Sequence, residues 1–274
     1  MSAPVGVAEK TAIAVTIAGS DSSGGAGIQA DLKTFSALGV YGASVIAALT
    51  AQNTRGVTGI HDVPPEFVAA QIDAVFSDLA VDAVKIGMLS VPATIEAVAA
   101  GLDRHRAKNV VLDPVMVSTS GARLLVPEAV EALVGLLLSR ADLLTPNLLE
   151  AAALLDAPVA TGEAEMVGQG EALLARGARA VLIKGGHGEG ADSVDVLVAP
   201  SGVSRHVAPR VATKNTHGTG CTLSSAIAAG LAGGLDLVDA VAVGKAYVAG
   251  AIAAADGLTI GAGFGPVHHF YRWW

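Results

Sequence analysis

The chain has 274 residues, of which 52% are hydrophobic and 15% are charged, and its net charge is −8. This composition excludes intrinsic disorder, and the acidic balance without a basic cluster argues against nucleic acid or an anionic membrane as partner. Because no uncharged stretch is apolar enough for a membrane helix, no secretory signal is visible and Cys221 is the only cysteine, we expect a cytoplasmic protein.

The hydrophobic pattern predicts strands and helices that alternate along the chain. The expected elements are, in chain order, a strand at 12–18, a helix at 26–38, a strand at 44–49, a helix at 64–79, a strand at 84–86, a helix at 91–106, a strand at 110–112, a helix at 127–139, a strand at 143–145, helices at 148–155 and 163–176, a strand at 180–184, a hairpin of 194–198 with 203–207, and helices at 219–233 and 237–255.

Strand runs without polar alternation, separated by helices, indicate a parallel sheet that is covered on both faces. We therefore predict an α/β fold, a three-layer α/β/α sandwich with a mostly parallel central sheet. We expect one domain over residues 1–274, with residues 1–10 as a flexible N-terminal extension. In such sheets ligands bind beyond the carboxyl ends of the strands. Polar or glycine-rich residues follow six predicted strands, at 19–21, 52–53, 87–88, 113–114, 145–147 and 184–186.

The first motif is a glycine loop at residues 19–27, Gly-Ser-Asp-Ser-Ser-Gly-Gly-Ala-Gly, between a predicted strand and a predicted helix. Its spacing matches neither the dinucleotide-binding fingerprint nor the Walker A loop. Glycine permits close approach of a ligand to the backbone. We interpret it as a ligand-binding loop, and the alternative is a tight strand-to-helix turn.

The second motif is Asn-Thr-His-Gly-Thr-Gly-Cys-Thr-Leu-Ser-Ser at residues 215–225, and the small residues that follow predict a buried helix. We call its first part, residues 215–221, which leads into this helix, the anion loop. Free amides and the helix dipole make such an end an anion site, and Gly218 and Gly220 leave its amides unobstructed. The alternative is a glycine-rich cap on a core helix. The position of Cys221 at this helix N-terminus predicts a lowered thiol pKa and a role in hydrogen bonding or proton handling.

Polar residues at three further strand ends complete the pattern. Asn147 and Glu150 have the spacing of a capping box, which alone could explain both. Asp113 closes a buried strand and suits the water shell of Mg²⁺. Lys184 closes another buried strand, where it neutralises a phosphate or extends to the surface. An anion hole, an acid pair and a lysine together predict a phosphoryl-transfer site.

Most of the chain resembles the hydroxymethylpyrimidine/phosphomethylpyrimidine kinase family of the ribokinase-like superfamily. The segments that carry the resemblance are 16–35, 51–54, 85–88, 145–147, 214–221 and, at the end, 265–270 with 273–274. The resemblance implies a ribokinase-like fold and a homodimer. It also implies ATP-dependent phosphorylation of 4-amino-5-hydroxymethyl-2-methylpyrimidine to its monophosphate and then to its diphosphate, for thiamin biosynthesis.

Matching positions imply the residue roles. The pyrimidine pocket would be formed by Gly19, Asp31, Gln52, Met88, Val115 and Cys221. Gln52 offers a donor and an acceptor to the aminopyrimidine edge. The catalytic set would be Lys184 with the anion hole of Gly218, Thr219, Gly220 and Cys221. ATP would contact Asn147, Lys184, Thr213, Lys214, Gly218 and Gly220, and Mg²⁺ would be held by Asp113 and Glu150, directly or through water.

Other functions stay open. The wider superfamily has an aspartate base where this chain has Cys221, so the thiol is either a base or a group that orients the acceptor. A pyridoxal-type kinase is a related alternative, against which Gln52 and Met88 argue. A non-catalytic pyrimidine sensor would not need Lys184. A cysteine hydrolase could use Cys221 with His217, but the sequence shows no separate group to orient the histidine.

Overall fold

The computed structural model describes residues 10–116, 125–186 and 190–274, so the expected N-terminal extension lies, except for residue 10, outside the described residues. The helices and strands are β1 (Ile13–Asp21), α1 (Gly27–Ala37), β2 (Tyr41–Asn53), β3 (Gly56–Asp62), α2 (Pro65–Asp78), β4 (Ala83–Ile86), α3 (Pro92–His105), β5 (Val110–Leu112), α4 (Pro127–Ala132), β6 (Leu143–Leu144), α5 (Leu148–Leu155), α6 (Glu163–Ala175), β7 (Val181–Lys184), β8 (Asp192–Ala199), β9 (Gly202–Pro209), α7 (Thr219–Ala232) and α8 (Leu237–Ala253).

The strands form one sheet in the order β3-β2-β1-β4-β5-β6-β7-β8-β9. Neighbours from β2 to β7 are parallel, whereas β3, β8 and β9 pair antiparallel at the two edges. The carboxyl ends of the parallel strands therefore meet at one edge of the sheet, where ligands bind in open α/β folds.

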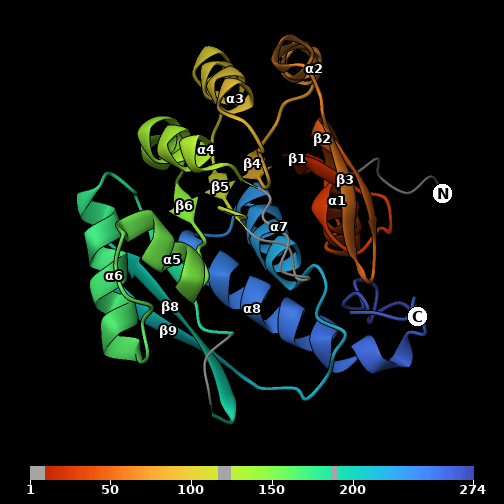
Figure 1. Cartoon of the computed structure of the whole chain (residues 1–274), viewed down its shortest axis with the longest axis vertical. Helices are drawn as coiled ribbons and strands as arrows, with labels where there is room; N and C mark the ends of the chain where they lie inside the picture. Colours follow the sequence, from red (N-terminus) through yellow and green to blue (C-terminus); the bar gives the residue numbers. More distant parts are fainter. Residues whose placement is uncertain (1–9, 117–124, 187–189) are drawn as a thin grey trace, which may run out of the picture.

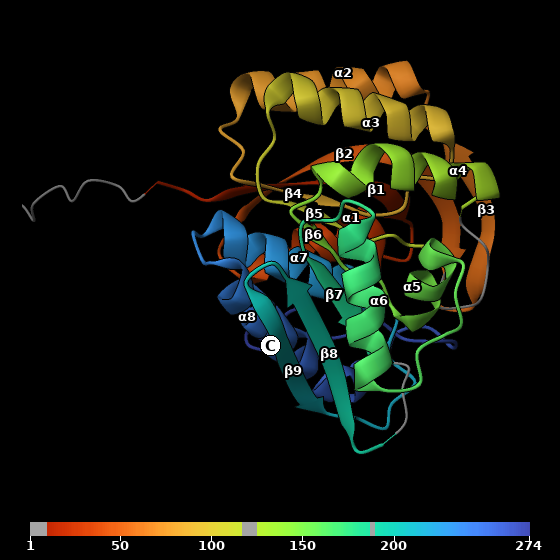
Figure 2. The same ribbon diagram turned by 90° about the vertical axis from the view of Figure 1, so that its left-hand side faces the viewer.

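Helices cover both faces of this sheet, as Figures 1 and 2 show. Successive strand residues point to opposite faces, and this alternation divides the core in two. One cluster joins residues such as Val15 and Ile86 to helices α2 to α6, and the other joins residues such as Ala14 and Val111 to α1, α7 and α8. The predicted three-layer α/β/α sandwich with a mostly parallel sheet is confirmed.

Two elements differ from the predictions. The hydrophobic pattern predicts no strand at β3, because most of its side chains are exposed and leave no hydrophobic period. The helix expected at 127–139 is α-helical only to Ala132 and continues as a π-helical turn, Leu133–Leu137, and a 3₁₀ turn, Leu138–Arg140. The apolar period continues through these turns, so periodicity alone could not mark the change.

Within the described residues, the span Leu237–Gly257 is long and apolar enough to cross a membrane, judged by length and composition. It consists of α8 and the 3₁₀ turn Ala255–Gly257. Core helices of soluble proteins have the same character, and here α8 packs against α7 and β9. Its buried Lys245 pairs with Asp195 of β8 at 2.8 Å. We interpret α8 as a core element of this fold.

Candidate active site

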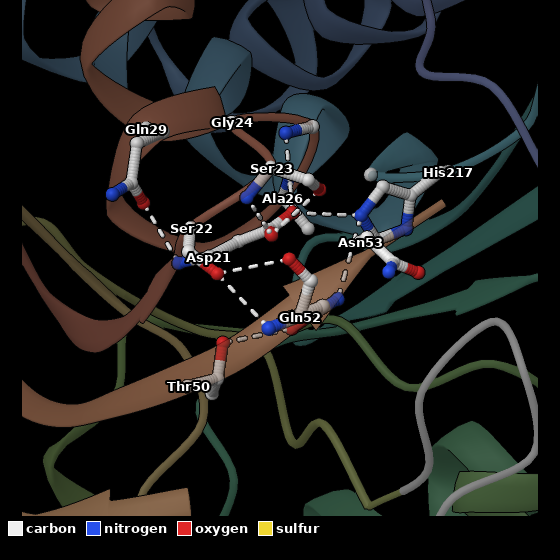
Figure 3. A network of polar contacts seen from close by, with 12 residues as sticks. Asp21, Ser22, Ser23, Gly24, Ala26, Gln29, Thr50, Gln52, Asn53 and His217 are labelled. Atoms are coloured by element: carbon white, nitrogen blue, oxygen red, sulfur yellow. Dashed lines mark hydrogen bonds and ion pairs between the residues drawn. The ribbon is translucent and has the colours of Figure 1, made fainter. Parts of the chain in front are cut away.

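The glycine loop is built around the carboxylate of Asp21, at the end of β1 (Figure 3). This carboxylate accepts hydrogen bonds from the amides of Ser23 at 2.8 Å, Gly25 at 3.1 Å and Ala26 at 2.8 Å. Burial alone would raise the pKa of Asp21, but hydrogen bonds from His217 and Ser23 outweigh it and lower the pKa to about 2. Asp21 is therefore an ionised anchor that fixes the shape of the loop.

The anion loop lies directly against the glycine loop. Gly218 caps α7 with a φ of +81°, and a Cβ there would lie 1.9 Å from the carbonyl oxygen of Gly25. Only glycine permits this backbone-to-backbone contact. The close packing brings the N-terminus of α7, where the sequence predicts an anion hole, beside the glycine loop, where it predicts a ligand.

Cys221 lies in the first turn of α7, where its thiol accepts a hydrogen bond from the backbone of Gly27. Burial raises the pKa of this thiol to about 11, although the positive charge of Lys85 opposes the shift. The predicted lowering of its pKa is therefore wrong, because desolvation outweighs the helix N-terminus. Cys221 is a neutral thiol at neutral pH.

Alkylation of Cys221 tests this protonation state, since the chain has no other cysteine. With a pKa of about 11, the thiolate fraction at pH 8 is about two hundred times smaller than that of a free cysteine. A thiolate of higher pKa is a better nucleophile, which raises the rate constant of the thiolate itself about tenfold. Iodoacetamide should therefore react with Cys221 about twentyfold more slowly than with free cysteine. The rate should keep rising above pH 10, and a plateau below pH 9 would contradict the raised pKa.

Lys184 joins the anion loop to the two predicted metal-binding carboxylates. Its Nζ lies 2.7 Å from Asp113 Oδ1 and 3.8 Å from Glu150 Oε2. Its side chain is 13% exposed, so it does not extend to the surface. A Cβ on Gly220 would lie 3.4 Å from Lys184 Nζ and 3.6 Å from Asp113 Oδ2. The lysine, the acids and the N-terminus of α7 therefore converge on one point.

The Asn147–Glu150 capping box is present, and it positions one of these carboxylates. The Glu150 amide donates to Asn147 Oδ1 at 2.9 Å, and the Asn147 amide donates to Glu150 Oε2 at 2.7 Å. Burial raises the pKa of Glu150, and Asp113 adds to the effect while Lys184 opposes it. Burial lowers the pKa of Lys184, but both acids outweigh it and raise the pKa to about 12.

Asp113 and Glu150 fit a magnesium ion that arrives bound to a nucleotide. No group of three or more His, Cys, Asp or Glu among the described residues could hold a metal. Mg²⁺ needs no such cage, because it keeps several waters and binds through one or two carboxylates plus substrate phosphates. Two carboxylates at one buried point, Asp113 and Glu150, supply that number and chemistry.

A pocket of about 430 Å³ lies beside the anion loop, and the predicted nucleotide residues Thr213 and Lys214 line it. Asn215 and Asp256 belong to the same wall, where Asn215 Nδ2 donates to Asp256 Oδ1 at 2.8 Å. Because Asn215 is three residues from Gly218, a nucleotide in this pocket has a short path to the N-terminus of α7.

Three of the predicted pyrimidine-binding residues, Gly19, Met88 and Gln52, belong to the glycine loop or contact it. A Cβ on Gly19 would lie 2.6 Å from Met88 Cε, so the methionine packs on this glycine. The Ser22 hydroxyl accepts a hydrogen bond from the backbone amide of Gln52 and donates one to its backbone carbonyl oxygen (Figure 3). These two bonds fix the end of β2 against the glycine loop. Val115 is half-buried against the core cluster that contains Met88.

Asp31 does not lie on the surface of the pyrimidine pocket, where the resemblance places it. Its side chain is fully buried, and its carboxylate accepts hydrogen bonds from Thr16, Lys85 and Ser225. Ser225 is one turn after Cys221 in α7, so Asp31 lies beneath the site and supports it. The structure does not bring this carboxylate to the surface of the pocket.

Two contacts of the site, those of Lys85 and His217, are not predicted from the sequence. Lys85 in the middle of buried strand β4 requires a charged partner, which the structure identifies as Asp31. His217 does have an orienting carboxylate, since its Nε2 lies 2.7 Å from Asp21 Oδ2. The prediction that the chain has no group to orient His217 is therefore wrong. The sequence could not reveal this carboxylate, because 196 residues separate the two partners. The hydrolase alternative still finds no support, because Cys221 is a neutral thiol.

The fold and this site define a kinase of the ribokinase-like class. The model of the phosphomethylpyrimidine kinase family matches residues 21–268. A hydroxymethylpyrimidine/phosphomethylpyrimidine kinase from Rhizobium meliloti (strain 1021) is 61% identical over 264 residues, which cover 96% of this chain and 99% of that protein. The chain therefore belongs to the phosphomethylpyrimidine kinase family, as the sequence resemblance predicted.

Solved structures agree with this assignment. Phosphomethylpyrimidine kinase from Clostridium difficile 630 is 45% identical with a TM-score of 0.77, over 87% of this chain and 98% of that chain. An ADP complex of Bacillus subtilis pyridoxal kinase is 34% identical with a TM-score of 0.88, over 96% of this chain and 99% of that chain. The predicted ribokinase-like fold and the predicted kinase class are both confirmed.

Proposed function

We propose that this chain transfers the γ-phosphoryl group of ATP to 4-amino-5-hydroxymethyl-2-methylpyrimidine, and then a second one to the resulting monophosphate. One observation carries the proposal: the N-terminus of α7 has the Lys184 cluster on one side and the glycine loop on the other. A transferred phosphoryl group needs a cationic, amide-lined position between its donor and its acceptor. The diphosphate is the pyrimidine donor that the sequence resemblance connects with thiamin biosynthesis.

The donor side is assigned from charge and position. ATP would occupy the pocket lined by Thr213 and Lys214. Its phosphates would extend toward Lys184 and the neighbouring Asn147. The amides of Gly218, Gly220 and Cys221 would stabilise the developing charge, and Lys184 would neutralise it. The Thr219 amide donates to the carbonyl oxygen of Thr216 at 3.2 Å and would have to give up this bond to join them. Asp113 and Glu150 would hold Mg²⁺, directly or through water, and this ion supplies charge neutralisation on the phosphates.

The acceptor side is assigned from the glycine loop. Gln52 would bond the aminopyrimidine edge, while Met88 and Val115 would contact the ring over Gly19. The hydroxymethyl oxygen would then lie near Cys221, which as a neutral thiol orients that oxygen and does not abstract its proton. The second acceptor is already an anionic phosphate, so it needs no strong base.

Pyridoxal is the second candidate acceptor, because a pyridoxal kinase shares this fold with a TM-score of 0.88. Its ring also carries a hydroxymethyl group on an aza-aromatic system. We expect the pyrimidine to be preferred, because Gln52 matches the aminopyrimidine edge. Initial rates of ADP release with each acceptor and with neither test the proposal. Faster turnover of pyridoxal, or equal rates with and without acceptor, would refute it.

Gln52→Ala should raise the KM for the pyrimidine about tenfold or more, because a site built to hydrogen-bond its substrate loses that energy with the side chain. The KM for ATP should stay within about twofold, since Gln52 lies on the acceptor side. Asn53→Ala is the matched control, an exposed neighbour whose side chain accepts a bond from the Arg55 amide. Steady-state kinetics check both variants, and an unchanged pyrimidine KM in Gln52→Ala would remove Gln52 from the pocket.

We also propose a cytoplasmic homodimer without nucleic acid or membrane partners. The net charge of −8 supports the exclusion of polyanionic partners, and the single cysteine suits a reducing compartment. Exposed apolar side chains on β2 and β3, such as Tyr41 and Ile60, suit burial against a second copy. Sedimentation equilibrium should give twice the chain mass of 27.2 kDa.

A further inference from the structure

His217 lies at the contact between the glycine loop and the anion loop (Figure 3). Its Nε2 is 2.7 Å from Asp21 Oδ2, and both side chains are buried. The same Nε2 is 3.5 Å from Gln52 Nε2, at the end of β2. A histidine of the anion loop therefore reaches the carboxylate that organises the glycine loop, next to the proposed pyrimidine contact.

The backbone around His217 leaves the ring little freedom to move. Its amide donates to the carbonyl oxygen of Gly265 at 3.0 Å, and its own carbonyl oxygen accepts from the Val267 amide at 3.2 Å. A Cβ on Gly25 would lie 2.4 Å from His217 Cδ2, so the glycine loop closes directly over the ring. The next residue is Gly218, which begins the proposed anion hole.

We propose that Asp21 and His217 are a positioning pair, which sets the distance between the bound acceptor and the anion hole. One carboxylate bonds the amides of Gly25 and Ala26 on the acceptor side and the His217 ring on the phosphate side. Loss of either partner would let the loops separate. A misplacement of about 1 Å between reacting groups costs about hundredfold in rate. This inference rests on the proposed function.

The test compares two substitutions of the histidine. His217→Leu removes the donor to Asp21 and should lower kcat about thirtyfold or more, with the KM for ATP within about twofold, because the nucleotide pocket is untouched. His217→Gln retains an N–H near the position of Nε2 and should recover kcat to within about fivefold of the wild type. Asp21→Asn should resemble His217→Leu. The double variant should lose no more than the worse single variant, because the pair acts as a unit.

His105 provides a matched control. Its Nε2 also lies 2.7 Å from a carboxylate, Asp73 Oδ1, but this pair joins α3 to α2. His105→Leu should leave kcat unchanged. Equal kcat losses in His217→Leu and His217→Gln, or an unchanged kcat in His217→Leu, would overturn the inference, provided that the thermal midpoint shows a folded protein.

Amide hydrogen exchange separates failure of this inference from failure of the proposed function. If the wild type does not phosphorylate the pyrimidine, the proposed function fails. The pair is then tested by exchange at the amides of residues 23–26, which should be faster in His217→Leu than in the wild type and His105→Leu. Unchanged exchange there would overturn the positioning pair independently of catalysis.

Discussion

Gly218→Ala is expected to lower kcat for both phosphorylations about hundredfold or more, which is the scale of losing one oxyanion donor. The new Cβ would lie 1.9 Å from the carbonyl oxygen of Gly25, so the anion loop and the glycine loop must separate. The φ of +81° adds strain to this clash. Steady-state kinetics on purified folded protein check the result.

Gly234→Ala separates the clash from the backbone strain. Gly234 has a similar φ of +88°, but a Cβ there would meet no atom within 4 Å. This control should lose about 1 kcal/mol of stability from the left-handed conformation and keep its kcat. If Gly218→Ala lost no more activity than Gly234→Ala, close contact of the two loops would not matter for catalysis.

Lys85→Met is expected to lower the free energy of unfolding by about 3–5 kcal/mol, because it leaves the Asp31 carboxylate buried without its cation. Both side chains are fully buried, and the ion pair spans 2.8 Å. Burial lowers the pKa of Lys85, but Asp31, Cys221 and Asp113 outweigh it and raise the pKa well above its usual value. Urea denaturation measures the change.

The double variant Lys85→Met with Asp31→Leu should recover part of that stability, because well-packed apolar residues can replace a buried ion pair at little cost. The recovery should stay incomplete, because the buried hydroxyls of Thr16 and Ser225 lose Asp31 as their acceptor. Arg205→Met is the control, since its ion pair with Glu163 is exposed and its loss should leave the midpoint unchanged. A Lys85→Met midpoint equal to that of Arg205→Met would show that the buried pair is not needed for stability.

Local patterns predicted much of this site, and the remainder depends on distant contacts. Asn147 and Glu150 are three residues apart, so their capping box could be read from spacing alone. The edge strand β3 carries mostly exposed side chains and gave no such signal. The Asp21–His217 contact joins residues that are 196 positions apart, and no local pattern specifies which loops will meet.

Burial explains why the structure differs from the predictions for Cys221 and Asp31. The helix N-terminus predicted a lowered pKa for Cys221, but the surrounding core desolvates the thiol and raises its pKa to about 11. Similarly, Asp31 was expected to face the ligand, whereas Lys85 from β4 holds its carboxylate under the site. In both cases the decisive surroundings come from other strands and helices, and they are fixed only when the sheet assembles.

The stoichiometry of ATP use tests the central claim most directly. The purified protein is mixed with Mg-ATP and 4-amino-5-hydroxymethyl-2-methylpyrimidine, and products are followed by mass spectrometry while ADP is counted. The proposed function predicts that the monophosphate rises and then falls as the diphosphate forms, with two ADP released for each diphosphate. Accumulation of the monophosphate as a final product, or no phosphorylated pyrimidine at all, would contradict it.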